Sequence, residues 1–220
     1  KKDHLLQLQQ TALFRGVDAD NIAGMLDCLQ AQTRAYKKGE AVFRQGEQLS
    51  QIAVVLAGKL HIQSDDYWGN HTIIADLAPG DLFGEAYVAP SSGPMLADVV
   101  CISDSVVALF QARRMLTVCT NAAPSTASFV QNLFYVLADK NRTLMQKLSL
   151  LATRTTRAKL TSYLHRRKRA RRVRKLTIPF NRQQLADYLS VDRSAMSAEL
   201  SKMRDEGLLE FDRDRFTLYH

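Results

Sequence analysis

The 220 residues are enough for one large domain or two modest ones, each with its own core. The sequence shows neither an apolar run of about 20 residues that would span a bilayer nor a secretory leader, so we expect a cytoplasmic protein with no membrane partner. Three cysteines, Cys28, Cys101 and Cys119, are odd in number and show no paired spacing, which argues against a disulfide framework.

The net charge of +8 is concentrated in the last third of the chain. Residues 1–150 hold 13 Lys and Arg against 14 Asp and Glu, whereas residues 151–220 hold 17 against 8, a net of +9. The run "HRRKRARRVRK" at 165–175 would by itself equally suit a solvated face or a linker. A basic last third nevertheless predicts binding to a polyanion such as nucleic acid.

Two helical stretches open the chain, at 4–17 and 18–29, and we expect Asp18 to cap the second. From Gln32 to Gln111, short β-branched and aromatic runs alternate with glycine-rich turns. Many short strands at this spacing predict a small antiparallel roll or barrel. The runs lie at 41–45, 51–58, 59–64, 71–77 and 98–110.

The longest helical pattern runs over 124–151, and one stripe along it has alternating spacings of three and four residues, the seam of a coiled coil. A lone polar residue in such a seam, here Asn141, commonly fixes register and strand number. A helix packed on its own domain is the alternative, and we favour a homodimer seam. The stripe consists of Phe134, Leu137, Asn141, Leu144, Leu148 and Leu151.

The last 69 residues predict a compact helical unit that ends in strands. Helices are expected over 155–167 and 181–189, with a strand at 175–180 between them and a hairpin at 207–220. Asn181 and Gln184 form a capping-box-like pair at the start of the second helix, and Asp192 caps a third.

That third helix contains "VDRSAMSAEL" (191–200) and has two unlike faces. Met196, Leu200 and Met203 stack on one side, whereas small side chains fill the other side and one arginine stands at the start. Exposed helical surface usually carries Lys, Glu and Gln, which form helices better than Ser does. The small face comprises Ser194, Ser197, Ala198 and Ser201, with Arg193 in the first turn.

Two helices joined by a tight turn at 190–191 are the helix-turn-helix arrangement. Small side chains let the second helix sink into the major groove, where Arg193 would read guanine O6 and N7 and the serines would meet bases or phosphates. Asn181, Arg182 and Gln183 open the preceding helix and are placed to meet phosphates. The hairpin with Asp212–Arg215 at its tip would be a wing beside the backbone.

At this point the chain resembles the Crp/Fnr family of bacterial transcription regulators over nearly its full length. The resemblance rests on "KKGEAVFRQGE", "VVLAGKL" and "LAPGDLFGEA" in the roll, and on the 181–210 segment "NRQQLADYLSVDRSAMSAELSKMRDEGLLE". It implies an α+β chain with an effector-sensing β-roll of the double-stranded β-helix or jelly-roll type (1–123), a dimerisation helix (124–151) and a winged helix-turn-helix domain (152–220). It further implies a homodimer on double-stranded DNA with a near-palindromic operator, contacting RNA polymerase.

Within that family Arg193 matches the base-reading arginine. The Glu and second Arg that follow it in the cyclic-AMP receptor are replaced here by Ser194 and Ala198, so the resemblance does not predict the operator sequence.

The effector is expected to differ from a cyclic nucleotide. In relatives that bind cyclic AMP, a Gly-Glu pair holds the ribose and an Arg-Ser pair holds the phosphate; here Gly84 and Glu85 are present, but Met95 and Leu96 stand at the later positions. Without a cation or a group of donors, a phosphate would be poorly held. Ala86 stands where the carbon-monoxide-sensing haem relative has a histidine.

Other sensing chemistries also lack their residues. The iron–sulfur relatives need four cysteines, mostly clustered, and the five histidines show no metal-ligand spacing, so no metal or cofactor is expected. The cysteines are expected to be buried apolar residues rather than redox switches. An apolar pocket remains, where Arg142 and Thr143 align with effector-contacting positions and Arg142 would pair with a small acidic or aromatic molecule.

Three alternatives stay open. The chain could be a cyclic-nucleotide-responsive regulator of the same family, a cupin-like roll-domain enzyme, or a cyclic-nucleotide module that regulates an attached catalytic domain. A cupin needs a cluster of His and Glu metal ligands that the sequence lacks, and no catalytic domain is present in the sequence. The basic, winged end favours a DNA-binding regulator that is not an enzyme.

Overall fold

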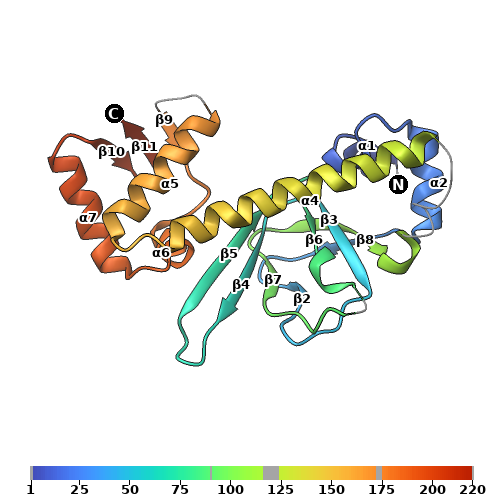
Figure 1. Cartoon of the computed structure of the whole chain (residues 1–220), viewed down its shortest axis with the longest axis horizontal. Coiled ribbons are helices and arrows are strands. Elements are labelled where there is room, and N and C mark those ends of the chain that lie inside the picture. The colour runs from blue at the N-terminus through green and yellow to red at the C-terminus, as the bar shows by residue number, and fades with distance from the viewer. Residues whose placement is uncertain (1, 90, 116–123, 172–174, 220) are drawn as a thin grey trace. The chain divides into compact units, whose positions relative to one another are not determined.

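The computed structural model describes residues 2–89, 91–115, 124–171 and 175–219. The chain forms two compact units (Figure 1). One comprises residues 1–64 and 74–141, and the other comprises residues 65–73 and 142–220. None of the described helices combines the length and the apolar character that a bilayer crossing requires.

Short helices open the first unit: α1 (Lys2–Gln9), the 3₁₀ turn η1 (Ala12–Phe14) and α2 (Ala19–Cys28). The single helix expected over 4–17 is therefore wrong, because the chain leaves the α-helix after Gln9. The Thr11 hydroxyl donates to Leu8 O at 2.6 Å, a local bond that competes with helix continuation. Asp18 occupies the N-cap position of α2 as expected, but its side chain makes no cap hydrogen bond.

Two four-stranded antiparallel sheets form the roll, with strand orders β1-β8-β3-β6 and β2-β7-β4-β5. Side chains of both sheets make one buried cluster, in which Phe43 and Phe83 pack edge to face at 5.6 Å. The predicted antiparallel roll is confirmed. Its strands are β1 (Gln32–Tyr36), β2 (Ala41–Phe43), β3 (Gln51–Ala57), β4 (Leu60–Asp65), β5 (His71–Leu77), β6 (Leu82–Phe83), β7 (Asp98–Cys101) and β8 (Ser105–Gln111), and the 3₁₀ turn η2 (Glu85–Tyr87) follows β6.

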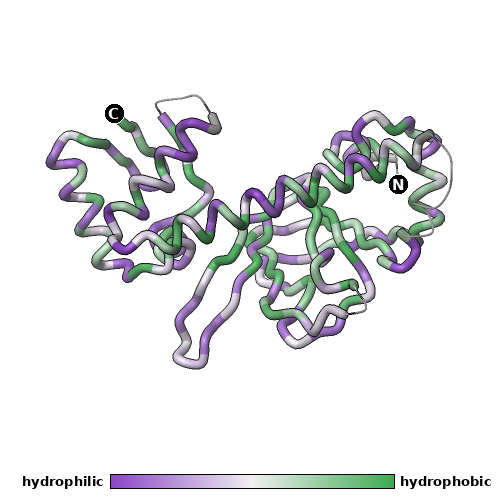
Figure 2. Tube along the Cα trace, in the orientation of Figure 1, coloured by the Kyte–Doolittle hydropathy of each residue, from purple (hydrophilic) through white to green (hydrophobic). Residues whose placement is uncertain are grey.

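Strand β3 is buried on both faces, which explains its continuous apolar run (Figure 2). Ala53 and Val55 face the cluster between the sheets, whereas Ile52, Val54 and Leu56 face a second cluster. That second cluster is closed by residues of α1, η1, α2 and the start of the long helix α4 (Pro124–Leu151), among them Phe129. Both faces of this sheet are thereby covered.

The single strand-like run expected at 98–110 is wrong, because a turn divides it into β7 and β8. The Asp104 carboxylate fixes this turn, accepting from Lys38 N at 3.0 Å and from Lys37 Nζ at 2.9 Å. Gly58 lies against it with φ +88°, and a side chain at Gly58 would overlap Ser105.

The second unit is built on a core of aliphatic and aromatic side chains that includes Leu150 of α4 and Phe180. Helix α5 continues to Arg171, four residues beyond the predicted end, so the first half of the basic run is helical. The sheet order is β10-β11-β9. The elements are α5 (Thr156–Arg171), β9 (Lys175–Thr177), α6 (Arg182–Leu189), α7 (Arg193–Asp205), β10 (Leu209–Asp212) and β11 (Arg215–Leu218).

Candidate nucleic-acid interface and effector site

Helices α6 and α7 are joined by a turn of three residues. The capping box opens α6 as predicted: Asn181 Oδ1 accepts from Gln184 N at 2.9 Å, and Gln184 Oε1 accepts from Asn181 N at 3.0 Å. Ser190 ends α6 in the left-handed region, with φ 50°. Asp192 Oδ1 then accepts from Ala195 N at 2.7 Å and starts α7. This local chemistry specifies a helix-turn-helix.

The two faces of α7 are as unlike in the structure as in the sequence. Met196, Leu200 and Met203 are buried in the core. Arg193, Ser194 and Ala198 are exposed, and Ser197 and Ser201 are half-buried. The Ser201 hydroxyl donates to Ser197 O at 3.2 Å. No ion pair among the described residues includes Arg193, so α7 presents a shallow surface with one extended cation at its start.

Arg182 has a partner that the sequence did not indicate. Its guanidinium lies over the rings of Phe211 and Phe216 at 4.5 and 5.1 Å, and burial lowers its pKa. Gln183 Nε2 donates to Asp187 Oδ1 at 2.8 Å. Arg182 thus ties the start of α6 to the β10–β11 hairpin, and contact of Asn181, Arg182 and Gln183 with phosphates stays a prediction.

Arg157 of α5 ties α5 to α7. Its Nε lies 2.5 Å from Glu199 Oε1, and its two terminal nitrogens donate to both oxygens of Glu206 at 2.7 Å. The two carboxylates raise the pKa of Arg157, and the guanidinium lowers that of Glu206. The sequence offered no indication of this pairing, because its members lie more than 40 residues apart.

Two lysines converge on the carbonyls that end α6. Lys147 of α4 is buried; its Nζ donates to Tyr188 O and to Ile73 O (3.2 Å), and it lies 3.1 Å from the centre of the Tyr188 ring. Lys159 donates to Leu189 O at 3.0 Å. Ammonium groups suit the negative end of a helix dipole, yet burial lowers the pKa of Lys147 to about 7, and the charge of Lys159 acts in the same direction.

In the roll, Glu85 is paired with a cation of the same chain. Gly84, with φ +86°, turns the chain between β6 and η2, and a Cβ there would lie 3.0 Å from the Phe43 ring. Glu85 Oε1 forms an ion pair with Lys140 Nζ of α4, which also donates to Leu82 O at 2.8 Å. Nearby, burial raises the pKa of Asp81, partly offset by a bond from Ala78 N and by Lys140. Lys140 was not among the predicted site residues.

The remaining predicted effector residues differ in their surroundings. Met95 is buried in the core between the sheets, whereas the next side chain, Leu96, is 71% exposed. Arg142 and Thr143 are exposed on α4, within the second unit. Ala86 lies in η2. An apolar pocket formed by these residues stays a prediction.

We next consider the side chains that could bind a metal ion or undergo redox chemistry in the part of the chain that the structure describes. Nowhere in that part are three His, Cys, Asp or Glu side chains grouped to hold a metal ion. Cys101 is buried as expected and burial raises its thiol pKa, whereas the expected burial is wrong for Cys28, which is exposed at the end of α2. Cys119 lies outside the described residues.

The stripe along α4 is exposed within one chain. Phe134 and Leu148 are 68% and 61% exposed, and Leu137, Asn141 and Leu144 are exposed as well. Leu151 is half-buried. Val130, four residues before Phe134, is also exposed and extends the same spacing toward the start of the helix. A row of large apolar side chains open to water along a helix marks an interaction surface.

Comparisons with known proteins agree with this architecture. The model of the cyclic nucleotide-binding domain family matches residues 33–122, and the model of the Crp-like helix-turn-helix domain matches residues 158–219. Transcriptional activator protein FnrL of Cereibacter sphaeroides is 23% identical over 194 residues, covering 84% of this chain and 75% of that protein. The cyclic AMP receptor protein of Thermus thermophilus is 29% identical over 105 residues, 47% of each chain.

The fold is shared with solved structures of the same class. FixK2 from Bradyrhizobium japonicum superposes with a TM-score of 0.66 at 22% identity, covering 86% of this chain and 93% of that one. A cyclic nucleotide-binding family domain followed by a Crp-like helix-turn-helix domain, as matched here, is the composition of a transcription regulator with an effector-binding domain and a DNA-binding domain. The chain belongs to the Crp/Fnr family of bacterial transcription regulators.

Proposed function

We propose that this cytoplasmic regulator, which is not an enzyme, binds a near-palindromic operator in double-stranded DNA as a homodimer and there contacts RNA polymerase. The observation that carries the proposal is the face of α7 on which Ser194, Ser197, Ala198 and Ser201 follow an exposed Arg193. Small side chains on this face let α7 enter the major groove. Arg193, at the N-terminal end of α7, then reaches base edges, principally those of guanine. Ser194, Ser197 and Ser201 supply further hydroxyl contacts.

The homodimer is formed through the α4 stripe. Two copies packed along it would cover the exposed Phe134, Leu144 and Leu148 and pair Asn141 with its symmetry mate. Two-fold symmetry then presents two α7 helices to successive major grooves, which is why the operator is expected to be near-palindromic.

For the effector, we propose a small molecule other than a cyclic nucleotide, with the Gly84–Ala86 turn of the roll at its site. Support comes from Glu85, whose carboxylate is already paired with Lys140, and from Met95 and Leu96, which offer a cyclic phosphate no charged donor. A cyclic-nucleotide-responsive regulator is the second candidate, favoured by the family matched over residues 33–122.

Selection of operator sequences from random duplexes, followed by binding titrations, tests the proposal. Arg193→Ala should cost about 1–3 kcal/mol on the selected site and little on random DNA, because a bidentate base contact carries the discrimination. Lys202→Ala, which removes an equal charge from the last turn of the same helix, is the control and should weaken both duplexes alike. If Arg193→Ala weakens binding to both duplexes equally, Arg193 contacts a phosphate rather than a base.

Calorimetric titration separates the two effector candidates. No saturable binding is expected at micromolar cyclic AMP or cyclic GMP. Installing the missing arginine by Met95→Arg is a poor converse test, since Met95 lies in the core. Micromolar binding by the unaltered protein would favour the second candidate.

A further inference from the structure

The positive charge of the last third does not reside in the helix-turn-helix. Residues 181–206, which hold both of its helices, contain four Lys and Arg against five Asp and Glu, a net of −1. Residues 165–175 contain eight Lys and Arg and no Asp or Glu, a net of +8. Sequence-independent affinity for DNA comes from neutralised phosphates, so the segment that would read bases carries little of the charge that would attract the duplex.

The structure places the first of these cations on the last turns of α5. We call Arg167, Lys168 and Arg169 the α5 cation cluster. Among the described residues no carboxylate forms an ion pair with Arg167 or Arg169, and Arg169 is exposed. The Arg167 guanidinium lies 5.6 Å from the centre of the Tyr163 ring, which orients it without neutralising it. Cations also suit this end of the helix dipole, so the helix is compatible with the charge.

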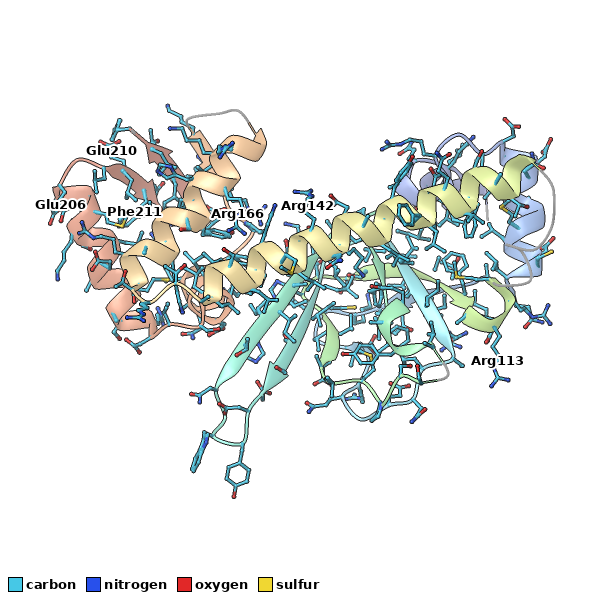
Figure 3. All side chains as sticks on the ribbon, viewed as in Figure 1. Arg113, Arg142, Arg166, Glu206, Glu210 and Phe211 are labelled. Carbon is cyan, nitrogen blue, oxygen red and sulfur yellow. The ribbon has the colours of Figure 1, made fainter. Side chains whose placement is uncertain are left out.

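Arg166 makes a hydrogen bond to another helix of the protein. Its guanidinium donates to Gln146 O of α4 at 2.7 Å. Figure 3 shows Arg142 projecting from α4 on the side where Arg166 lies. Since this bond positions the end of α5 on α4, Arg166 is set apart from the cluster.

The cluster is distant from the reading helix but attached to it. Lys159, near the start of α5, donates to the carbonyls of Leu189 and Ser190 at the turn between α6 and α7. Arg169 lies ten residues further along the same helix, a rise of about 15 Å. A rigid helix thus holds the cluster at a fixed separation from the helix-turn-helix, a distance that corresponds to several base pairs of duplex.

We propose that the α5 cation cluster is a second DNA-contacting surface, which binds backbone phosphates flanking the operator and supplies the attraction that the helix-turn-helix lacks. This inference rests on the proposed DNA-binding function. Duplex DNA is favoured over an acidic protein because the cluster belongs to the same compact unit as α7, whose own segment is net negative. Phosphate contacts of this kind set affinity and position without reading sequence.

The test is the salt dependence of binding to a labelled random duplex, with the triple variant Arg167→Gln, Lys168→Gln, Arg169→Gln. The slope of log K against log salt should fall by about 2 to 2.7, since each phosphate contact contributes about 0.9. At about 0.1 M salt that corresponds to a loss of affinity of roughly 100- to 500-fold. The ratio of operator to random affinity should stay within about threefold of its original value, because Arg193 is untouched.

Two further variants make the result specific. Lys38→Gln, Arg44→Gln, Lys59→Gln removes the same charge from exposed positions of the roll and should leave the slope unchanged. Arg167→Lys, Arg169→Lys keeps the charge and should keep the slope, which covers the case in which the glutamine variant fails to fold. If the original protein binds no DNA at any salt concentration, the proposed function is overturned. If it binds and the glutamine variant has the original slope, the cluster serves another partner, such as an acidic protein.

Discussion

At the scale of single residues, the ion pair between Glu85 and Lys140 determines what the roll can offer a ligand. Both side chains are largely buried, at 19% and 29% exposure, so each compensates the other's loss of water. A ligand that uses Glu85 must displace or accommodate the ammonium of Lys140. Gly84, which precedes Glu85, forms the turn and has no side chain with which to bind a ligand.

Lys140→Met should therefore destabilise the first unit, which contains the roll, by about 1–3 kcal/mol, because it leaves a buried carboxylate without its cation. Glu85→Gln in the same background should recover much of the loss. Chemical denaturation of the single and double variants gives the coupling energy. If the two substitutions change the free energy of unfolding additively, Glu85 and Lys140 do not stabilise each other.

Lys147 makes the stability of the second unit, the DNA-binding unit that contains the helix-turn-helix, depend on pH with a defined sign. Burial lowers its pKa to about 7, whereas an unfolded lysine holds its proton to about 10.5. Between these two pH values Lys147 is protonated in the unfolded chain but largely neutral in the folded chain. The free energy of unfolding therefore rises with pH, by up to about 1.4 kcal/mol per pH unit. Below about pH 7 both states are protonated and this dependence vanishes.

Denaturation at several pH values with Lys147→Met as reference measures this effect. The original protein should gain stability relative to the variant as the pH rises from about 7 to 9, and the difference should be constant below that range. The reference removes the contribution of every other titrating group. A difference that does not change with pH would mean that Lys147 stays charged when folded, held by the carbonyls of Tyr188 and Ile73.

At the scale of elements, α4 has an exposed apolar stripe whose members contribute little to their own chain. Substitutions there should alter association and leave the fold in place. The opposite holds for Leu150, which belongs to the core of the DNA-binding unit although it lies on the same helix.

Leu144→Asp should give a folded monomer in sedimentation velocity, because it sets a charge opposite its symmetry mate in an apolar seam. Thr143→Asp adds the same charge one residue away, outside the stripe, and should remain dimeric. Circular dichroism should be unchanged in both. A Leu144→Asp protein that still sediments as a dimer would place the interface elsewhere.

At the scale of the whole molecule, the proposed homodimer would owe its affinity for an operator to two DNA-binding units held together. The segment 142–220 contains Leu150, Lys147 and nearly all of the core on which the helix-turn-helix rests, so we expect it to fold alone. It lacks half of the α4 stripe, from Phe134 to Asn141. As a monomer it should bind the operator about 100- to 10,000-fold more weakly than the full chain, because the second contact is no longer intramolecular. Titrations of both proteins against one operator measure the difference, and equal affinities would show that two half-sites are not bound together.

The sequence alone determined the features that depend on neighbours along the chain. Periodicity gave the roll strands, the long helix and both faces of α7, and short-range capping chemistry gave the start of α6 and α7. Arg193, the serines and the α4 stripe could be chosen because their roles follow from where a helix places them. The missed end of α1 is a departure of the same short range, made by a local hydrogen bond that competes with the helix. The missed turn at Asp104 is of the opposite kind, because its carboxylate binds Lys37 and Lys38, which lie more than 60 positions earlier in the chain.

Only the tertiary structure decided which distant side chains meet. Lys140 with Glu85, Arg157 with Glu199 and Glu206, and Lys147 with Tyr188 all join residues more than 40 positions apart. A lysine in a sequence gives no indication of whether it will meet a carboxylate, a carbonyl or water, since packing sets its partner after the elements are formed. Packing likewise decided that Met95 is buried in the core and that its neighbour Leu96 is exposed. Both lie outside any helix or strand, so no periodic pattern in the sequence could predict which of them would be buried.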